Sequence, residues 1–238
     1  MNNYVVCAVQ RAGKTWIVNT LNRLGLGDGM ELLTEFERNC APEQARLSAA
    51  ADSGGMAGLA RAFAEVTVEE GLPCVGLALQ WNNLDVIPTE RRPAELTGFI
   101  RALNPCTVFF LRRRDVLAQA ISHYLMFESG YAHSTDPDSA RQQRAGVPYD
   151  RAVLDRWVAF TRQGYAGWSN LFAAAGMEPV NLYYEDFVDN PKTSFAGLAE
   201  RIAGRGFDPE VVGAAATGLS RVSDEKNEVF RARYLAGE

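Results

Sequence analysis

The chain has 238 residues, a formal net charge of −5 and 47% hydrophobic residues. This length suits one α/β domain with a full core, and the acidic balance argues against a protein that coats nucleic acid. No apolar run reaches the length of a membrane span, and no basic leader precedes an apolar stretch, so we expect a cytoplasmic protein without a membrane span.

Cysteine and histidine usage gives no indication of a metal centre. The four cysteines lie at positions 7, 40, 74 and 106, and none forms a Cys-x-x-Cys pair. His123 and His133 are the two histidines of the chain. Because zinc sites need several such ligands at short spacing, we expect reduced core thiols and no metal, and we interpret His123 as a structural residue.

The N-terminal stretch predicts an anion site. A short apolar run, Tyr4–Val9, is followed by a turn of small residues, Gln10–Gly13, and by an amphipathic segment that stops at Gly25. This order indicates a buried strand, a tight turn and a helix. Such a turn directs backbone N–H groups and the positive end of the helix dipole at one point. Because Arg11 and Lys14 add two cations there, we expect a phosphate or sulfate to bind.

Two interpretations of this turn remain open from the residues alone. Residues 8–15 fit a relaxed P-loop, Ala-x-x-x-x-Gly-Lys-Thr, in which alanine replaces the first glycine. Residues 10–16 also fit the 5′-phosphosulfate loop of sulfotransferases, in which a basic residue, a small residue, a glycine and a hydroxyl residue open the helix. The plainest alternative is a strand-to-helix turn with solvated basic residues.

Further apolar runs and helical periods follow along the chain. Buried strands are predicted at 75–79, 107–111 and 179–184. Helices are predicted at 56–71, 93–103, 116–125, 150–175 and 193–203, with the longest beginning after Asp150. Residues 27–37 and 40–52 show no clear period, and 128–148 is expected to be a long connection. The alternation predicts an α/β, three-layer fold with a mostly parallel central sheet and helices on both faces.

Polar segments follow each predicted strand. Ligands of parallel sheets bind beyond the carboxyl ends of the strands, so we expect these segments along one edge. A P-loop kinase needs a magnesium-binding carboxylate at a strand end, and the surroundings of Asp186 are poor for magnesium. Three consecutive arginines, Arg112–Arg114, instead suit a second anion that binds without metal.

Several segments together resemble the PAPS-dependent sulfotransferases, where PAPS is 3′-phosphoadenosine 5′-phosphosulfate, in the version of bacterial trehalose 2-sulfotransferase and its relatives. Arg112–Asp115 with Gln119–Ser122 is similar to their 3′-phosphate motif, and residues 10–15 are similar to their Gln-Arg-Ser-Gly-Ser-Thr. Tyr184–Phe187 resembles their late Tyr-Glu-Asp-Leu. The matches run in order from about residue 4 to 234, although Lys14 replaces a small hydroxyl residue.

The resemblance implies one sulfotransferase domain over residues 1–238 with a P-loop-like fold. It implies an enzyme that moves a sulfuryl group from PAPS to a hydroxyl of a carbohydrate or other small-molecule acceptor, in line and without metal. It allows a sugar or a glycolipid as the acceptor. It also allows assembly of the chain as a homodimer. Arg11 and Lys14 would also act in catalysis, and the residues implied to bind the donor are Arg11, Ala12, Gly13, Lys14, Thr15, Trp16, Arg112, Arg114 and Ser122.

Glu35 is the candidate general base, because an acceptor hydroxyl must lose its proton as it attacks sulfur. In the relatives a glutamate before an aromatic residue has this role, and Glu35 precedes Phe36. Glu31 is the alternative base, and a plain surface acid is the other interpretation of Glu35. Two other functions stay open: an ATP-dependent P-loop small-molecule kinase, and a nucleotide- or carbohydrate-binding protein without catalysis.

Overall fold

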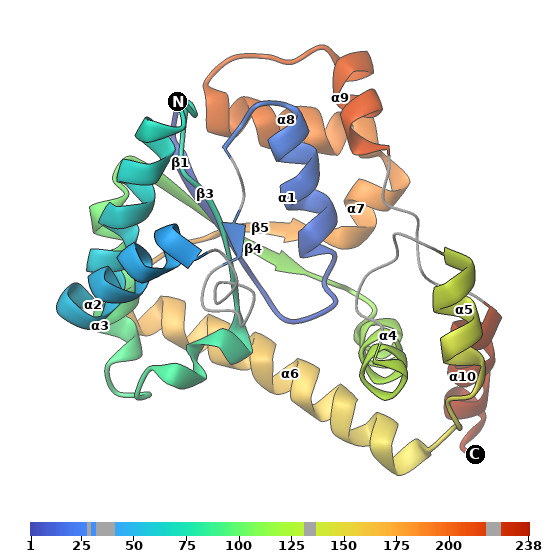
Figure 1. Ribbon diagram of the computed structural model, residues 1–238. Coiled ribbons are helices and arrows are strands. Elements are labelled where there is room, and N and C mark those ends of the chain that lie inside the picture. Colours follow the sequence, from blue (N-terminus) through green and yellow to red (C-terminus); the bar gives the residue numbers. More distant parts are fainter. Residues whose placement is uncertain (28–29, 32–40, 131–136, 218–224) are drawn as a thin grey trace.

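The computed structural model describes residues 1–27, 30–31, 41–130, 137–217 and 225–238 (Figure 1). Among these residues, five parallel strands form one sheet in the order β2-β3-β1-β4-β5. The strands are β1 (Asn3–Ala8), β2 (Met30–Glu31), β3 (Gly76–Gln80), β4 (Cys106–Arg112) and β5 (Val180–Tyr183). The α/β class and the parallel sheet predicted from the sequence are confirmed.

β1 lies at the centre of the sheet because it is apolar on both of its faces. All residues from Tyr4 to Ala8 are fully buried. Successive side chains of a strand point to opposite faces. Val5 and Cys7 therefore join the core on one side of the sheet, and Val6 joins the core on the other. A strand buried on both faces is a continuous apolar run, which is why the sequence predicts it well.

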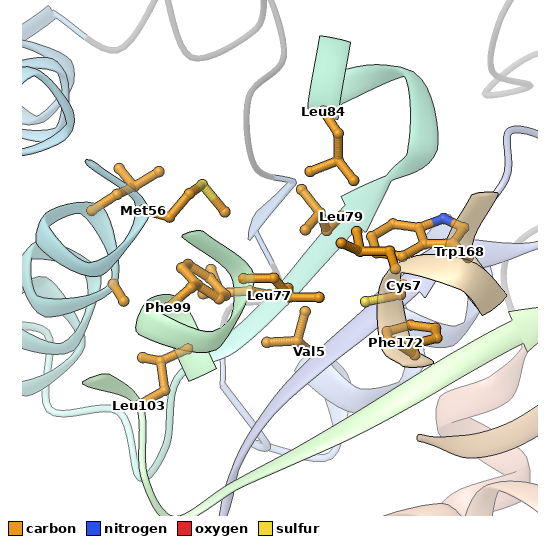
Figure 2. Close-up of a cluster of buried hydrophobic side chains, with 14 of the residues drawn as sticks. Val5, Cys7, Met56, Leu77, Leu79, Leu84, Phe99, Leu103, Trp168 and Phe172 are labelled. Atoms are coloured by element: carbon orange, nitrogen blue, oxygen red, sulfur yellow. The ribbon is translucent and has the colours of Figure 1, made fainter. Parts of the chain in front are cut away.

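Helices cover both faces of the sheet (Figure 1). Figure 2 shows the core on the first face, to which Val5, Leu77 and Trp168 all belong. The helices of this face are α2 (Ala41–Glu69), α3 (Arg92–Ala102) and α6 (Arg151–Ala174). Those of the second face are α1 (Lys14–Arg23), α7 (Tyr184–Asp189), α8 (Pro191–Ala203) and α9 (Pro209–Ala216). The predicted three-layer arrangement is confirmed.

A third apolar cluster lies beside the sheet and fixes the helix that follows β4. It joins α4 (Val116–Ser129) to α6 and to α10 (Glu225–Ala236), with Tyr124 and Phe230 at its centre. The first turn of α4 is capped by Asp115, whose carboxylate accepts from the N–H of Ala118 at 2.9 Å. The same carboxylate also binds Arg231 of α10. α4 is therefore held both at its start and along one side.

Two helical segments were not predicted from the sequence. Residues 41–52 are helical and form the first part of α2, because alanine has a high helix propensity even without an apolar period. Within 128–148 lies α5 (Pro137–Ala145), whose proline at the first helical position was the usable signal. α2 spans 29 residues but is interrupted at Gly55, so α6, with 24 residues, is the longest uninterrupted helix among the described residues, as expected. The two-residue β2 is too short to have a pattern.

Other sequence expectations are confirmed. Asp150 caps α6 by accepting from the N–H of Val153 at 3.0 Å. Cys7 and Cys74 are buried free thiols, and burial raises the pKa of both, so they are uncharged core residues. Cys40 lies outside the described residues. No helix in the described part of the chain is both long and apolar enough to cross a membrane.

Candidate functional site

The turn between β1 and α1 has the backbone geometry of an anion-binding loop. Gly13 is the N-cap of α1 with φ of 96°, and Arg11 has φ of 63°. Both values lie in the left-handed region, which residues other than glycine adopt rarely. The N–H of Ala12 donates to the carbonyl of Val9 at 3.2 Å and closes the turn. The loop therefore presents the amino end of α1, where N–H groups and the helix dipole favour an anion.

An aromatic ring lies directly against this loop. A Cβ atom at Gly13 would be 2.4 Å from Cδ2 of Tyr184, so no other residue fits there without movement. Trp16 contacts the same ring edge-on, with ring centroids 6.1 Å apart. The indole N–H of Trp16 donates to the carbonyl of Ala216 at 2.9 Å, which anchors the first turn of α1 to α9. Glycine is thus needed both for its φ value and for its lack of a side chain.

The cations of the loop are withdrawn from solvent. Lys14 is only 7% exposed. Nε of Arg11 donates to Oγ of Ser122 at 3.2 Å, which joins the loop to α4. Burial, followed by the charges of Arg144 and Arg113, lowers the pKa of Arg11 to about 10, so its guanidinium remains charged at neutral pH. The expectation that the loop and the segment after β4 meet at one edge of the sheet is confirmed.

A chain of buried hydrogen bonds also connects these two segments. Nε2 of Gln119, on α4, donates to the carbonyl of Gln10 at 2.7 Å. Its Oε1 accepts from the hydroxyl of Tyr165, on α6, at 2.6 Å. The same hydroxyl accepts from the backbone N–H of Arg113 at 2.8 Å. Because burial raises the pKa of Tyr165, the hydroxyl keeps the proton that it donates. Tyr165 thus holds the loop after β1 and the segment after β4 in place.

The three consecutive arginines lie against different neighbouring side chains. The guanidinium of Arg112 is 5.4 Å from the ring centroid of Tyr165. Arg114 binds both carboxylate oxygens of Asp186, at 2.7 and 3.1 Å, and its side chain is 50% exposed. Arg114 and Ser122, which the resemblance places at one phosphate, do not bond to each other among the described residues. Ser122 instead accepts from Arg11.

The middle arginine, Arg113, faces the loop. Its guanidinium carbon is 3.8 Å from the ring centroid of Tyr184. The same ring lies against Gly13. Nε of Arg113 is buried without a hydrogen-bond partner among the described residues. The motif selects Arg112 and Arg114, and nothing in the local sequence sets Arg113 apart as a binding residue.

The two candidate bases differ in how far the structure describes them. Glu35 lies outside the described residues. Glu31 ends β2, and the backbone register places it beside Ala78, which in turn pairs with Val6 of β1. The chain thus comes back along the sheet edge and reaches the level of Val6 four residues before Glu35. The strand β2 itself was not predicted, because residues 27–37 show no clear period.

His123 is a buried residue whose imidazole also feels the charge of Arg11 from the loop. It follows Ser122, its ring lies 4.0 Å from that of Trp157, and it is 5% exposed. Burial first, and then the positive charge of Arg11, lowers the pKa of His123 to about 4. The imidazole is therefore neutral at physiological pH, and its Nδ1 is buried without a hydrogen-bond partner in the described part of the protein.

Arg144 is a second residue that sequence reasoning missed. It lies in α5, is 1% exposed and acts electrostatically on Arg11. Its place in a polar stretch gave no signal of burial. For the residues that the structure describes, no group of three or more His, Cys, Asp or Glu side chains could hold a metal ion.

Comparison with known proteins agrees with this geometry. The chain is 23% identical to trehalose 2-sulfotransferase of Mycobacterium tuberculosis (strain ATCC 35801 / TMC 107 / Erdman) over 261 residues. That alignment covers 98% of this chain and 94% of the relative. The family profile of the Stf0 sulphotransferases matches residues 3–237, which include the loop, the arginines and all five strands. The chain therefore belongs to the Stf0 sulphotransferase family.

Proposed function

We propose that the protein transfers a sulfuryl group from PAPS to a hydroxyl of a carbohydrate or other small-molecule acceptor, as one domain over residues 1–238. Family membership supports sulfuryl transfer, and the name of the trehalose 2-sulfotransferase relative supports a sugar acceptor. The hydrogen bond between Arg11 and Ser122, at 3.2 Å, carries the proposal. It joins the loop to the helix after the arginines, so one nucleotide with two anionic ends can bind both.

The loop fits the 5′-phosphosulfate end of the donor. Gly13 lets the backbone approach the ligand, and the amino end of α1 favours its charge. Arg11 and Lys14 would neutralise the developing charge during transfer. The contacts proposed for this end are made by Arg11, Ala12, Gly13, Lys14, Thr15 and Trp16.

The 3′-phosphate is proposed to bind Arg112, Arg114 and Ser122. Arg114 is already paired with Asp186, but this pair is half exposed. Exposed ion pairs contribute only about 0–1 kcal/mol, so a phosphate dianion can compete for the guanidinium. The same pair leaves Asp186 poorly suited to magnesium, which disfavours a kinase.

In the proposed reaction the acceptor oxygen attacks sulfur in line. The new O–S bond forms while the bond between sulfur and the 5′-phosphate oxygen breaks. The proton of the acceptor hydroxyl passes to the carboxylate of Glu35, and the charge left on the phosphate oxygen is balanced by Arg11 and Lys14. The products are a sulfate ester and adenosine 3′,5′-bisphosphate, so no oxidant or reductant is needed.

Calorimetry with two nucleotides tests the donor. Adenosine 3′,5′-bisphosphate should bind in the presence of EDTA, and much more tightly than ATP with Mg²⁺. Loss of nucleotide binding in EDTA would favour the kinase instead. Turnover of labelled PAPS with trehalose and other sugars then tests catalysis, since tight binding without any turnover would indicate a binding protein.

Glu35→Gln tests the proposed base. The change keeps the size of the side chain but removes its basicity, so kcat should fall by roughly 10²–10⁴. Donor affinity should stay near the wild-type value, because the carboxylate is proposed to face the acceptor. β2 supports this placement, since the four residues after Glu31 can extend over roughly 13 Å. Glu31→Gln is the matched control, and wild-type turnover by the Glu35 variant would transfer the role to Glu31.

A further inference from the structure

The three consecutive arginines after β4 have different surroundings, and only some of them are already compensated. Arg114 shares its charge with Asp186 through two hydrogen bonds, at 2.7 and 3.1 Å. Arg113 makes no ion pair with any described carboxylate, and its Nε is buried without a hydrogen-bond partner. Leaving a donor of a charged group buried and unpaired is costly. Within the described residues, no carboxylate compensates the positive charge of Arg113.

The position of Arg113 indicates where that partner binds. Its guanidinium is stacked on one face of the Tyr184 ring, at 3.8 Å from the centroid. The same ring lies against Gly13, where a Cβ atom would be 2.4 Å away. The backbone of Arg113 is fixed as well, because its N–H donates to the hydroxyl of Tyr165 at 2.8 Å. Arg113 is thus held beside the phosphate loop, not at the exposed end of the arginine triplet.

Arg113 also adds to a concentration of positive charge at the loop. The charges of Arg113 and Arg144 both lower the pKa of Arg11. Like charges gathered out of water destabilise one another unless an anion joins them. A bound phosphosulfate would relieve this repulsion.

We propose that Arg113 binds the 5′-phosphosulfate end of the donor beside Arg11, whereas Arg114 serves the 3′ end. This inference rests on the proposed function and divides the arginine triplet into two binding roles. It adds a residue that sequence spacing did not select. It also predicts that two adjacent arginines respond differently to the same pair of nucleotides.

Calorimetry on Arg113→Met and Arg114→Met, with two nucleotides, tests the division. Methionine keeps an unbranched apolar stem against the Tyr184 ring but removes the charge. Adenosine 3′,5′-bisphosphate carries both phosphates, whereas adenosine 5′-phosphosulfate lacks the 3′ group. The Arg113 variant should bind both nucleotides roughly tenfold to a hundredfold more weakly. The Arg114 variant should lose affinity for the bisphosphate alone.

The outcomes separate this inference from the proposed function. If the wild-type protein binds neither nucleotide, both fail. If the wild type binds both and the Arg113 variant binds them equally well, or loses only the bisphosphate, the inference fails and the function stands. Arg113→Lys keeps the charge but not the planar stack, so it should retain most of the affinity. An Arg113→Lys variant as weak as Arg113→Met would show that stacking, not charge, is what matters. Thermal unfolding of each variant confirms that it is folded.

Discussion

The buried imidazole of His123 gives the protein a pH-dependent stability at the scale of one residue. Its pKa is lowered to about 4 in the fold, by burial and by Arg11, whereas an unfolded histidine titrates near 6.5. Between these values the unfolded chain binds a proton that the folded chain does not. The free energy of unfolding therefore falls as the pH falls, by about 1 kcal/mol from pH 6.5 to 5.5.

Urea unfolding at pH 7.0, 6.5, 6.0 and 5.5 measures this effect. His123→Phe, which keeps a ring against Trp157, should remove most of the slope in this window. The second histidine of the chain offers a matched control, because His133→Gln should leave the slope unchanged. If the wild type and His123→Phe lose equal stability, another group is responsible.

At the scale of elements, Tyr165 of α6 holds the loop after β1 and the loop after β4 together. Tyr165→Phe removes the hydroxyl that accepts from Arg113 and donates to Gln119. Because the N–H of Arg113 and Oε1 of Gln119 lose their partner, the free energy of unfolding should fall by about 1–3 kcal/mol. Affinity for adenosine 3′,5′-bisphosphate should fall as well, since the relative position of both loops is loosened.

Tyr4→Phe is the matched control for this element-scale prediction. Tyr4 lies at the amino end of β1, and its buried hydroxyl donates to the carbonyl of Leu26 at 2.8 Å. The same chemical change should lower stability there without changing nucleotide affinity. Equal affinities of the Tyr165 and Tyr4 variants would show that Tyr165 has only a structural role. Calorimetry and urea unfolding on both variants supply the comparison.

Elements with a strong apolar pattern could be predicted from the sequence. Elements that depend on pairing with distant segments, or on helix propensity without an apolar stripe, could not. β1 is a continuous apolar run, so its burial on both faces was visible. β2 has two residues, and its pairing with β3 depends on where the chain returns in space. The first part of α2 relies on alanine propensity, not on an apolar stripe.

The candidate site shows the same division. The loop was predictable because the glycine, the cations and the strand-to-helix order are all local. The different surroundings of Arg113 and Arg114 were not, because they depend on Tyr184 and Asp186, some seventy residues later in the chain. Spacing alone selected Arg114 with Ser122, whereas the fold bonds Ser122 to Arg11. Contacts between distant segments carry information that a local motif does not contain.

At the scale of the whole molecule, one sheet with both of its faces covered should unfold as a unit. α10 is tied into the same structure by Phe230 in the third cluster and by the ion pair of Arg231 with Asp115. We therefore expect a single calorimetric transition for residues 1–238. Adenosine 3′,5′-bisphosphate at a hundred times its Kd should stabilise the fold by about 2.7 kcal/mol.

Scanning calorimetry with and without the bisphosphate measures this whole-molecule prediction. The calorimetric and van't Hoff enthalpies should agree, as they do for a two-state transition. Raising the salt concentration should weaken nucleotide binding but leave a single transition, because salt screens the attraction between the nucleotide and the cations near the loop. Two resolved transitions would contradict the assignment of one domain.

Trp16 makes the proposed donor site optically observable. Its indole lies in the first turn of α1, edge-on to the Tyr184 ring that Arg113 stacks upon. Any anion that enters the loop must change the polarity and charge around this fluorophore, whereas Trp168 is fully buried in the core. Donor binding can therefore be followed by intrinsic emission, titrated rapidly and compared among nucleotides. Large acceptor collections can then be screened for compounds that alter this signal, before any acceptor has been identified.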